Sequence, residues 1–113
     1  MAPADDLNKI FVSAQVMPQF PGGTDALVKF MLRNLHQPDD LQSGEAIKVI
    51  ASFVVNKAGS IKNIKIVSSG RADLDQEVLR VMNKMPLWKP GLQNGKPVSV
   101  YFNLPVTFKG LDE

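Results

Sequence analysis

The chain has 113 residues, a net charge of +2 and a hydrophobic content of 44%, which together indicate a single globular domain. Its 13 basic residues are scattered and nearly balanced by 11 acidic ones, so charge gives no reason to expect a nucleic-acid or anionic-membrane partner. The absence of cysteine excludes disulfides, thiolate metal sites and cysteine nucleophiles.

Neither a signal peptide nor a membrane-spanning segment is recognisable. Residues 1–9 are polar, and we expect them to form a flexible leader. No apolar run reaches the roughly 18 residues that a membrane helix needs. If the protein is anchored to a membrane, the anchor helix is expected to lie outside this sequence.

The first predicted elements are a short strand at residues 10–16 and a helix. From Thr24 the apolar positions recur at the three- and four-residue spacing of one helix face. These positions are Leu27, Phe30, Met31 and Leu35. Thr24 is the expected N-cap, and Pro38 requires the helix to stop at or before His36. One helical turn is expected around residues 39–42.

The middle of the chain predicts a β-hairpin. In residues 46–56 the odd positions are apolar and share one face, while Ile50 and Val54 make the other face partly apolar, as in a central strand. The turn follows, and Gly59 is free to take a positive φ there. The second hairpin strand is expected at residues 61–68, with Ile64 and Ile66 pointing inward.

A second helix is predicted to begin at Asp73 and to be ended by Pro86. Asp73 and Gln76 have the spacing of a capping box. The apolar stripe of this helix consists of Leu74, Val78, Val81, Met82 and Met85. Residues 88–97 are interpreted as a turn-rich connection with a tight turn at Asn94–Gly95.

The last predicted strand, residues 98–109, alternates between apolar even positions and other residues at odd positions. The order of elements is therefore β-α-β-β-α-β. This order predicts an α+β fold in which two helices pack on one face of a small antiparallel sheet. The domain is expected to span residues 10–109, with a short tail at residues 110–113.

Pro105 indicates that this last strand lies at an edge of the sheet. Proline has no N–H for a ladder hydrogen bond, so the missing donor should face the open side. The backbone groups of Ser99, Tyr101 and Asn103 are then expected to face the same side. Two interpretations of the edge stay open: the strand at residues 11–16 pairs along it, or an extended partner peptide adds to it.

No residue pattern indicates catalysis, a metal site or a cofactor. His36 is the only histidine, and neither the pair Asp39–Asp40 nor Gly22–Gly23 comes with the partners that a catalytic or phosphate-binding site requires. Trp88 is expected to be a packing anchor. Tyr101 is expected on the outer face of the last strand, in contact with a partner or with a neighbouring strand.

Several stretches, taken in order, resemble the C-terminal domain of TonB energy transducers in the form typical of Bacteroidetes-type proteins. They are Phe20-Pro21-Gly22-Gly23, Phe53-Val54-Val55-Asn56-Lys57-Ala58-Gly59-Ser60-Ile61, Asp75-Gln76-Glu77-Val78-Leu79-Arg80-Val81-Met82, Met85-Pro86-Leu87-Trp88-Lys89-Pro90-Gly91, Gln93-Asn94-Gly95-Lys96-Pro97-Val98, and the terminal Tyr101, Leu104-Pro105-Val106 and Phe108. Each stretch alone is weak evidence, but their order is specific.

The resemblance implies a periplasmic, non-enzymatic domain of an inner-membrane protein, without cofactor or metal. Such domains bind the TonB box of outer-membrane receptors, near the plug domain, by β-strand addition beside the last long strand. The ExbB–ExbD motor would act through an N-terminal part, with its anchor helix, that this sequence lacks. The implied partner-binding residues are Val98, Ser99, Val100, Tyr101, Phe102, Asn103 and Leu104, together with Gln37 and Pro38, where the family usually has Tyr-Pro.

Three alternatives stay open. A TonB-like interaction domain of a sensor or peptidase paralogue would have the same fold but another client. RNA-recognition domains share the order of elements, although the K/R-G-F/Y motif is absent and Phe53, Phe102 and Phe108 are expected on the helix-covered face. An exposed edge also supports a homodimer.

Overall fold

The computed structural model describes residues 9–67 and 69–110. It contains the helices α1 (Thr24–Asn34) and α2 (Ala72–Met82) and the strands β1 (Ile10–Phe11), β2 (Ala46–Val55), β3 (Ile61–Val67), β4 (Gly91–Gln93) and β5 (Lys96–Lys109). The α+β fold class is confirmed. Most of the predicted leader and tail, and Ser68 at the end of the predicted hairpin, lie outside the described residues.

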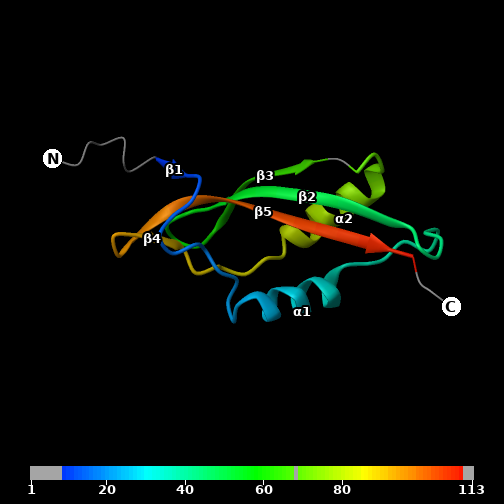
Figure 1. Cartoon of the computed structure of the whole chain (residues 1–113), viewed down its shortest axis with the longest axis horizontal. Coiled ribbons are helices and arrows are strands. Elements are labelled where there is room, and N and C mark those ends of the chain that lie inside the picture. The colour runs from blue at the N-terminus through cyan, green and yellow to red at the C-terminus, as the bar shows by residue number, and fades with distance from the viewer. Residues whose placement is uncertain (1–8, 68, 111–113) are drawn as a thin grey trace.

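The strands form one curled sheet in the order β1-β5-β2-β3, and β4 pairs with the start of β5. The longest pairing joins β2 and β5 from Ala46 opposite Lys109 to Val55 opposite Val100. These two strands run the length of the molecule (Figure 1). The sheet is mixed rather than antiparallel throughout, because β1 runs parallel to β5.

The core lies between the sheet and the helices. The odd residues of β2 from Val49 to Val55 are buried on this face, where α2 contributes Leu74, Val78 and Met82, as the helical stripe predicts. The partly buried Ile64 and Ile66 of β3 also pack against this core, as expected. In Figure 1, α2 lies behind β2 and β3, whereas α1 runs alongside β5. No helix of the described residues lies on the opposite face of the sheet.

Trp88 is a packing anchor, as predicted. Its ring lies 5.7 Å from Phe20, 5.5 Å from Phe53 and 5.1 Å from Phe102, measured between centroids, with edge-on geometry in all three pairs. The backbone N–H of Trp88 donates to the Gly59 carbonyl at 2.8 Å. Gly59 has φ +87° and a Cβ there would collide with the Trp88 carbonyl, so only glycine fits this contact.

The N-terminal strand is much shorter than predicted. Only Ile10 and Phe11 pair with β5, and Val12 is exposed. The chain then turns toward β4, where Val16 bridges Leu92 and Gln19 bridges Lys89. The prediction of a continuous strand at residues 10–16 was wrong because the two ends of this segment bind different strands.

Both predicted side-chain caps were wrong. Helix α1 is capped by Gly23, whose φ of +89° suits the position and whose carbonyl accepts from the Leu27 N–H at 3.1 Å; Thr24 is already helical. Helix α2 is capped by Arg71, without a side-chain cap bond, so Asp73 lies inside the helix and no capping box forms with Gln76. The helix ends at Met82, before Pro86.

Two further details differ from the sequence prediction. The connection at residues 88–97 contains strand β4, which forms a hairpin with the start of β5 around Asn94 and Gly95. Both turn residues have positive φ, 53° and 76°, as a two-residue hairpin turn requires. Residues 39–42 form no helical turn; Asp40 instead makes an ion pair with Arg71 at 3.2 Å.

Candidate peptide-binding edge

One side of β5 is occupied along its whole length. Strand β4 pairs with residues 96–98, and β2 pairs with residues 100–109. Pro97 and Pro105 are both at odd positions, opposite Leu92 and Ile50. In an antiparallel ladder, hydrogen-bonded pairs alternate with pairs that make no hydrogen bond to each other, and proline, which has no N–H, fits only the second kind. The even residues of β5 therefore bond to β2 and β4, and the backbone groups of the odd residues point to the other side.

The other side of β5 is open for most of its length. Strand β1 pairs only at Ser99 and Val100. From Tyr101 to Lys109 no strand among the residues that the structure describes pairs on this side, and we call this stretch the open edge. The first sequence interpretation therefore holds in part, because the N-terminal strand covers the start of the edge and no described strand pairs with the remainder. Addition of a partner peptide stays a prediction.

A groove runs between α1 and the open edge. It encloses about 360 Å³, within the range of roughly 300–1,000 Å³ that is typical of ligand pockets. Its walls consist of Thr24, Leu27, Val28, Met31, Leu32, Leu35 and Gln37 on one side and Leu104, Pro105, Val106 and Thr107 on the other. No β2 residue lines it, so in the described part of the chain the groove lies on the side of β5 away from β2. The unpaired backbone of the open edge therefore lies directly beside an apolar groove.

The end of α1 is fastened to α2 by charged hydrogen bonds. Arg80 donates from Nη2 to the Asn34 carbonyl at 2.6 Å and to Glu77 Oε2 at 2.7 Å. The His36 backbone N–H donates to the same Glu77 oxygen at 2.6 Å. These bonds, first that of Arg80, hold the pKa of Glu77 below its usual range although partial burial opposes the shift. This clamp fixes where the α1 wall of the groove ends.

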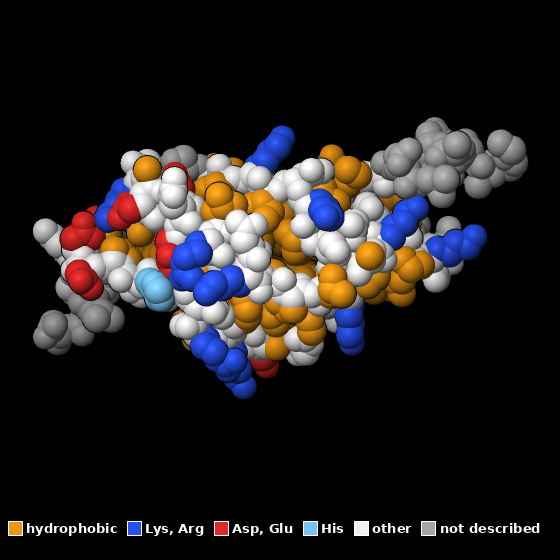
Figure 2. All heavy atoms as spheres, turned by 180° about the vertical axis from the view of Figure 1, so that it is seen from behind, with side chains coloured by type: hydrophobic (Ala, Val, Ile, Leu, Met, Phe, Trp, Pro, Cys, Tyr) orange, Lys and Arg blue, Asp and Glu red, His pale blue; other side chains and the backbone are white. Residues whose placement is uncertain are grey.

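The helix-covered side combines an apolar middle with charged groups at one end. Figure 2 shows this side, with hydrophobic side chains across the middle and several acidic side chains near His36. The His36 side chain is largely exposed, as expected from its place after a helix. Its ring nitrogen lies 3.9 Å from Glu77, too far for a hydrogen bond.

The structure divides the predicted partner-binding residues into groups. Val98 faces Gly91 in the β4 hairpin, and β1 engages Ser99 and Val100. The remaining four, Tyr101, Phe102, Asn103 and Leu104, lie on the open edge. Gln37 lines the same groove as Leu104, so the structure brings the two parts of the predicted site together, and Pro38 follows directly.

Side chains of the open edge alternate between the two faces. Phe102 packs against Phe53 on the core side, with 5.5 Å between ring centroids. Tyr101 is 48% exposed on the uncovered face, opposite Val54, and Asn103 accepts a hydrogen bond from the Ser52 hydroxyl at 2.6 Å. Tyr101 therefore has a cross-strand neighbour and a free surface.

Sequence reasoning missed the part of the site that α1 supplies. Val28 and Leu32 line the groove but were not among the predicted core or partner-binding positions. A signal was present, because these two residues extend the apolar stripe of α1 beyond the width that one packed face requires. The C-terminal half of the edge, Pro105 to Lys109, was also left out of the predicted site.

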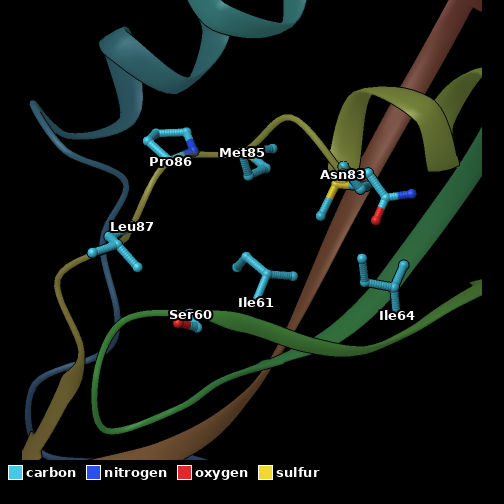
Figure 3. Close-up of a pocket in the computed structure, with 8 residues that line it drawn as sticks. Ser60, Ile61, Ile64, Asn83, Met85, Pro86 and Leu87 are labelled. Atoms are coloured by element: carbon cyan, nitrogen blue, oxygen red, sulfur yellow. The ribbon is translucent and has the colours of Figure 1, made fainter.

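Two other hollows lack the same combination of features. One, of about 280 Å³, lies on the uncovered sheet face beside Tyr101 and Lys65. The other, of about 220 Å³, lies between β3 and the connection after α2 (Figure 3). In Figure 3, Ile61 and Ile64 come from the strand and Met85, Pro86 and Leu87 from the connection. It is lined by no acidic, basic or histidine side chain, so it offers no evident chemistry.

Neither a metal site nor a membrane span is found in the part of the chain that the structure describes. No group of three or more histidine, cysteine or acidic residues is placed to hold a metal. No helix there is long and apolar enough to cross a bilayer.

Fold and edge together define a small α+β domain with a curled sheet, two helices and one long strand, β5, whose outer side is largely unpaired among the described residues. The chain belongs to the family described as Gram-negative bacterial TonB protein C-terminal, whose sequence pattern matches residues 41–109. The resemblance to TonB C-terminal domains is thereby confirmed, whereas the Bacteroidetes-type form stays a prediction. The family is a periplasmic, transport-related, non-enzymatic one that interacts with outer-membrane receptors. The match includes β5 but begins after α1. The chain matches no curated protein sequence.

Proposed function

We propose that this domain is the receptor-binding part of a TonB-type energy transducer and that it captures the TonB box of an outer-membrane receptor as an added β-strand. The observation that supports the proposal is the open edge of β5. From Asn103 onward its outward backbone groups have no partner strand among the described residues, and an extended peptide would satisfy them.

The composition of the open edge favours a role in binding, because the edge lacks the features that usually prevent another strand from pairing with it. Proteins usually blunt exposed edges with charges, bulges or very short strands. Here Tyr101 to Phe108 contains no charged residue, and only Pro105 and the terminal Lys109 interrupt the edge. Such an edge would be an aggregation hazard if it had no partner, which supports peptide binding as its role.

The wider setting of the proposal follows from the family. The domain would reach from the inner membrane toward the receptor's plug domain and pass on work from the ExbB–ExbD motor, through a part of the transducer upstream of this sequence. Inner-membrane anchoring would likewise be provided upstream. A second copy of the chain is the competing occupant of the edge, and sedimentation over a concentration series separates self-pairing from a monomer.

Amide NMR with receptor peptides tests the proposal. Peptides from the N-terminal segments of outer-membrane receptors encoded in the same genome are added to the labelled domain. We expect the amide signals of Asn103 and Thr107 to shift, because their N–H groups face outward and have no partner strand, while β3 amides stay unchanged. Shifts confined to β3 and α2, or none with any receptor segment, would overturn strand addition at β5.

A further inference from the structure

Helix α1 exposes apolar side chains that its packing does not require. Leu32 is 74% exposed and Val28 is 50% exposed, one helical turn apart on the same side. Both line the groove beside the open edge, together with the less exposed Met31 and Leu35. Two large aliphatic groups so placed next to unpaired backbone indicate a surface that is covered when the edge is used.

The geometry of β5 determines which side chains of an added strand would face this groove. Even residues of β5 point toward the helices, and Leu104 and Val106 line the groove. Side chains on paired strands share a face when the residues lie opposite each other. Partner residues opposite Leu104 and Val106 would therefore lie over the groove, against Val28 and Leu32. The intervening partner residues would lie over the uncovered face.

The uncovered face is basic. Lys48 lies opposite Thr107, and Lys109 ends the open edge. Lys65 lies one strand further away, opposite Ser52. The strands β1 to β5 contain no aspartate or glutamate. The charge that the strands contribute to this face is positive only, so acidic side chains of a partner are favoured there.

We propose that the groove between α1 and β5 recognises the side chains of the added strand. It selects an extended segment with apolar residues at alternate positions, facing α1, and acidic or polar residues between them. This inference rests on the proposed strand addition and names the chemistry of the segment. The β5 wall lies inside the family match at residues 41–109, whereas the α1 wall lies before it.

Pro105 adds a requirement on length. It offers no N–H, so the backbone bonds to a partner fall into two blocks, one at the Tyr101 carbonyl and Asn103 and one at Thr107 and Lys109. The groove residues Leu104 and Val106 lie between these blocks. A segment that is to use both blocks and fill the groove must span the whole open edge.

Two synthetic peptides of identical composition, each as long as the open edge, test the inference. In one, single leucine or valine residues alternate with glutamate or threonine; in the other, the same residues are rearranged so that apolar pairs alternate with polar pairs. The first places successive apolar side chains on one face of a strand and the second does not. We expect the first to bind at least tenfold more tightly and to shift the methyl signals of Val28, Leu32 and Leu104.

The readouts separate this inference from strand addition itself. Two results would overturn selection by the groove but leave strand addition standing. One is a shift of the Tyr101 and Asn103 amides with equal affinity for both peptides, and the other is a shift of these amides without any methyl shift. Methyl shifts without edge amide shifts would overturn strand addition and this inference with it. No response to either peptide, with a response to a receptor segment of different pattern, would also overturn the groove.

A matched pair of variants completes the test. Leu32→Ser removes an exposed groove residue, and Leu87→Ser removes an equally apolar residue that is 63% exposed far from the groove. We expect Leu32→Ser to weaken the alternating peptide on the order of tenfold and Leu87→Ser to leave it unchanged. Both side chains are exposed, so the fold should persist. Equal effects of the two variants would contradict the inference.

Discussion

Trp88 is the residue on which the aromatic part of the core depends, and its indole N–H has no hydrogen-bond partner among the described residues. Burying a polar group without a partner costs about 1–3 kcal/mol. We therefore expect Trp88→Phe to stay within about 1 kcal/mol of the parent, because the lost contacts are offset by removal of this donor. Trp88→Ala should cost about 3–5 kcal/mol, since the cavity would adjoin three aromatic rings. Urea unfolding followed by circular dichroism measures both; a phenylalanine variant as unstable as the alanine variant would show that the N–H is bonded.

The direction of each N–H along β5 can be tested one residue at a time. Asn103→Pro removes a donor that faces the open side, whereas Leu104→Pro removes one that faces β2. We expect the first variant to stay folded and to lose peptide binding. The second should lose about 3 kcal/mol or more of stability, because a ladder bond inside the sheet is broken. Leu104→Ala separates the loss of the side chain from the loss of the donor. If both prolines destabilise the fold equally, the assignment of odd residues to the open side is wrong.

At the scale of elements, the clamp between α1 and α2 predicts a pH dependence. The pKa of Glu77 is lowered in the folded state, chiefly by the Arg80 hydrogen bond. Its contribution to stability is therefore fully present above the ordinary glutamate pKa and is lost as the pH falls through the lowered folded value. Glu77→Gln should cost on the order of 1–2 kcal/mol at neutral pH and much less under acid conditions.

Urea unfolding of the parent and of Glu77→Gln across the acid range checks this. The two stability curves should converge as the pH falls. Asp73→Asn is the matched control, because an arginine, Arg71 at 2.7 Å, likewise lowers the pKa of Asp73, but this side chain is well exposed and bonds to no described residue of α1 or of the loop after it. A constant gap between parent and Glu77→Gln at every pH would mean that Glu77 acts through shape and not through charge.

The strands and helices that the sequence predicted well are those with a local signal. In β2 and β5 the alternation of side chains is a property of each strand alone, so bounds and faces could be derived without knowledge of the partner. Strand β4 has three residues and is a strand only because residues 96–98 lie beside it. The segment after Phe11 was predicted as a strand because its composition allows one, yet its pairing depends on distant residues.

The part of the candidate site that the backbone of β5 forms could be predicted from the sequence. Pro105 indicated an edge from a single residue, and the second proline of β5, Pro97, has the same parity, which is consistent with it. The α1 wall could not be derived in the same way, since a helical stripe does not say which of its residues meet the sheet. Val28 and Leu32 have the same apolar character as the packed Leu27 and Met31, and only the tertiary structure distinguishes them.

At the scale of the whole molecule, charge is separated by element. All aspartates and glutamates between residues 9 and 110 lie in helices or connections, while the charged residues of β2, β3 and β5 are all lysines. The net charge of +2 conceals this separation, because it sums groups on opposite sides of the sheet. A partner that approaches the uncovered face therefore meets a more positive surface than the composition indicates.

This separation predicts how salt acts on peptide binding. Reversing the two lysines beside the C-terminal part of the edge, Lys48→Glu with Lys109→Glu, should weaken the alternating acidic peptide about tenfold at low salt. The deficit should largely disappear at about 1 M salt, where the Debye length falls to about 3 Å. Lys84→Glu, which follows α2, is the control and should change binding little at any salt concentration. Fluorescence anisotropy with a labelled peptide measures all three proteins. A deficit that persists at high salt would show that the lysine side chains contribute packing at the edge rather than charge over the uncovered face.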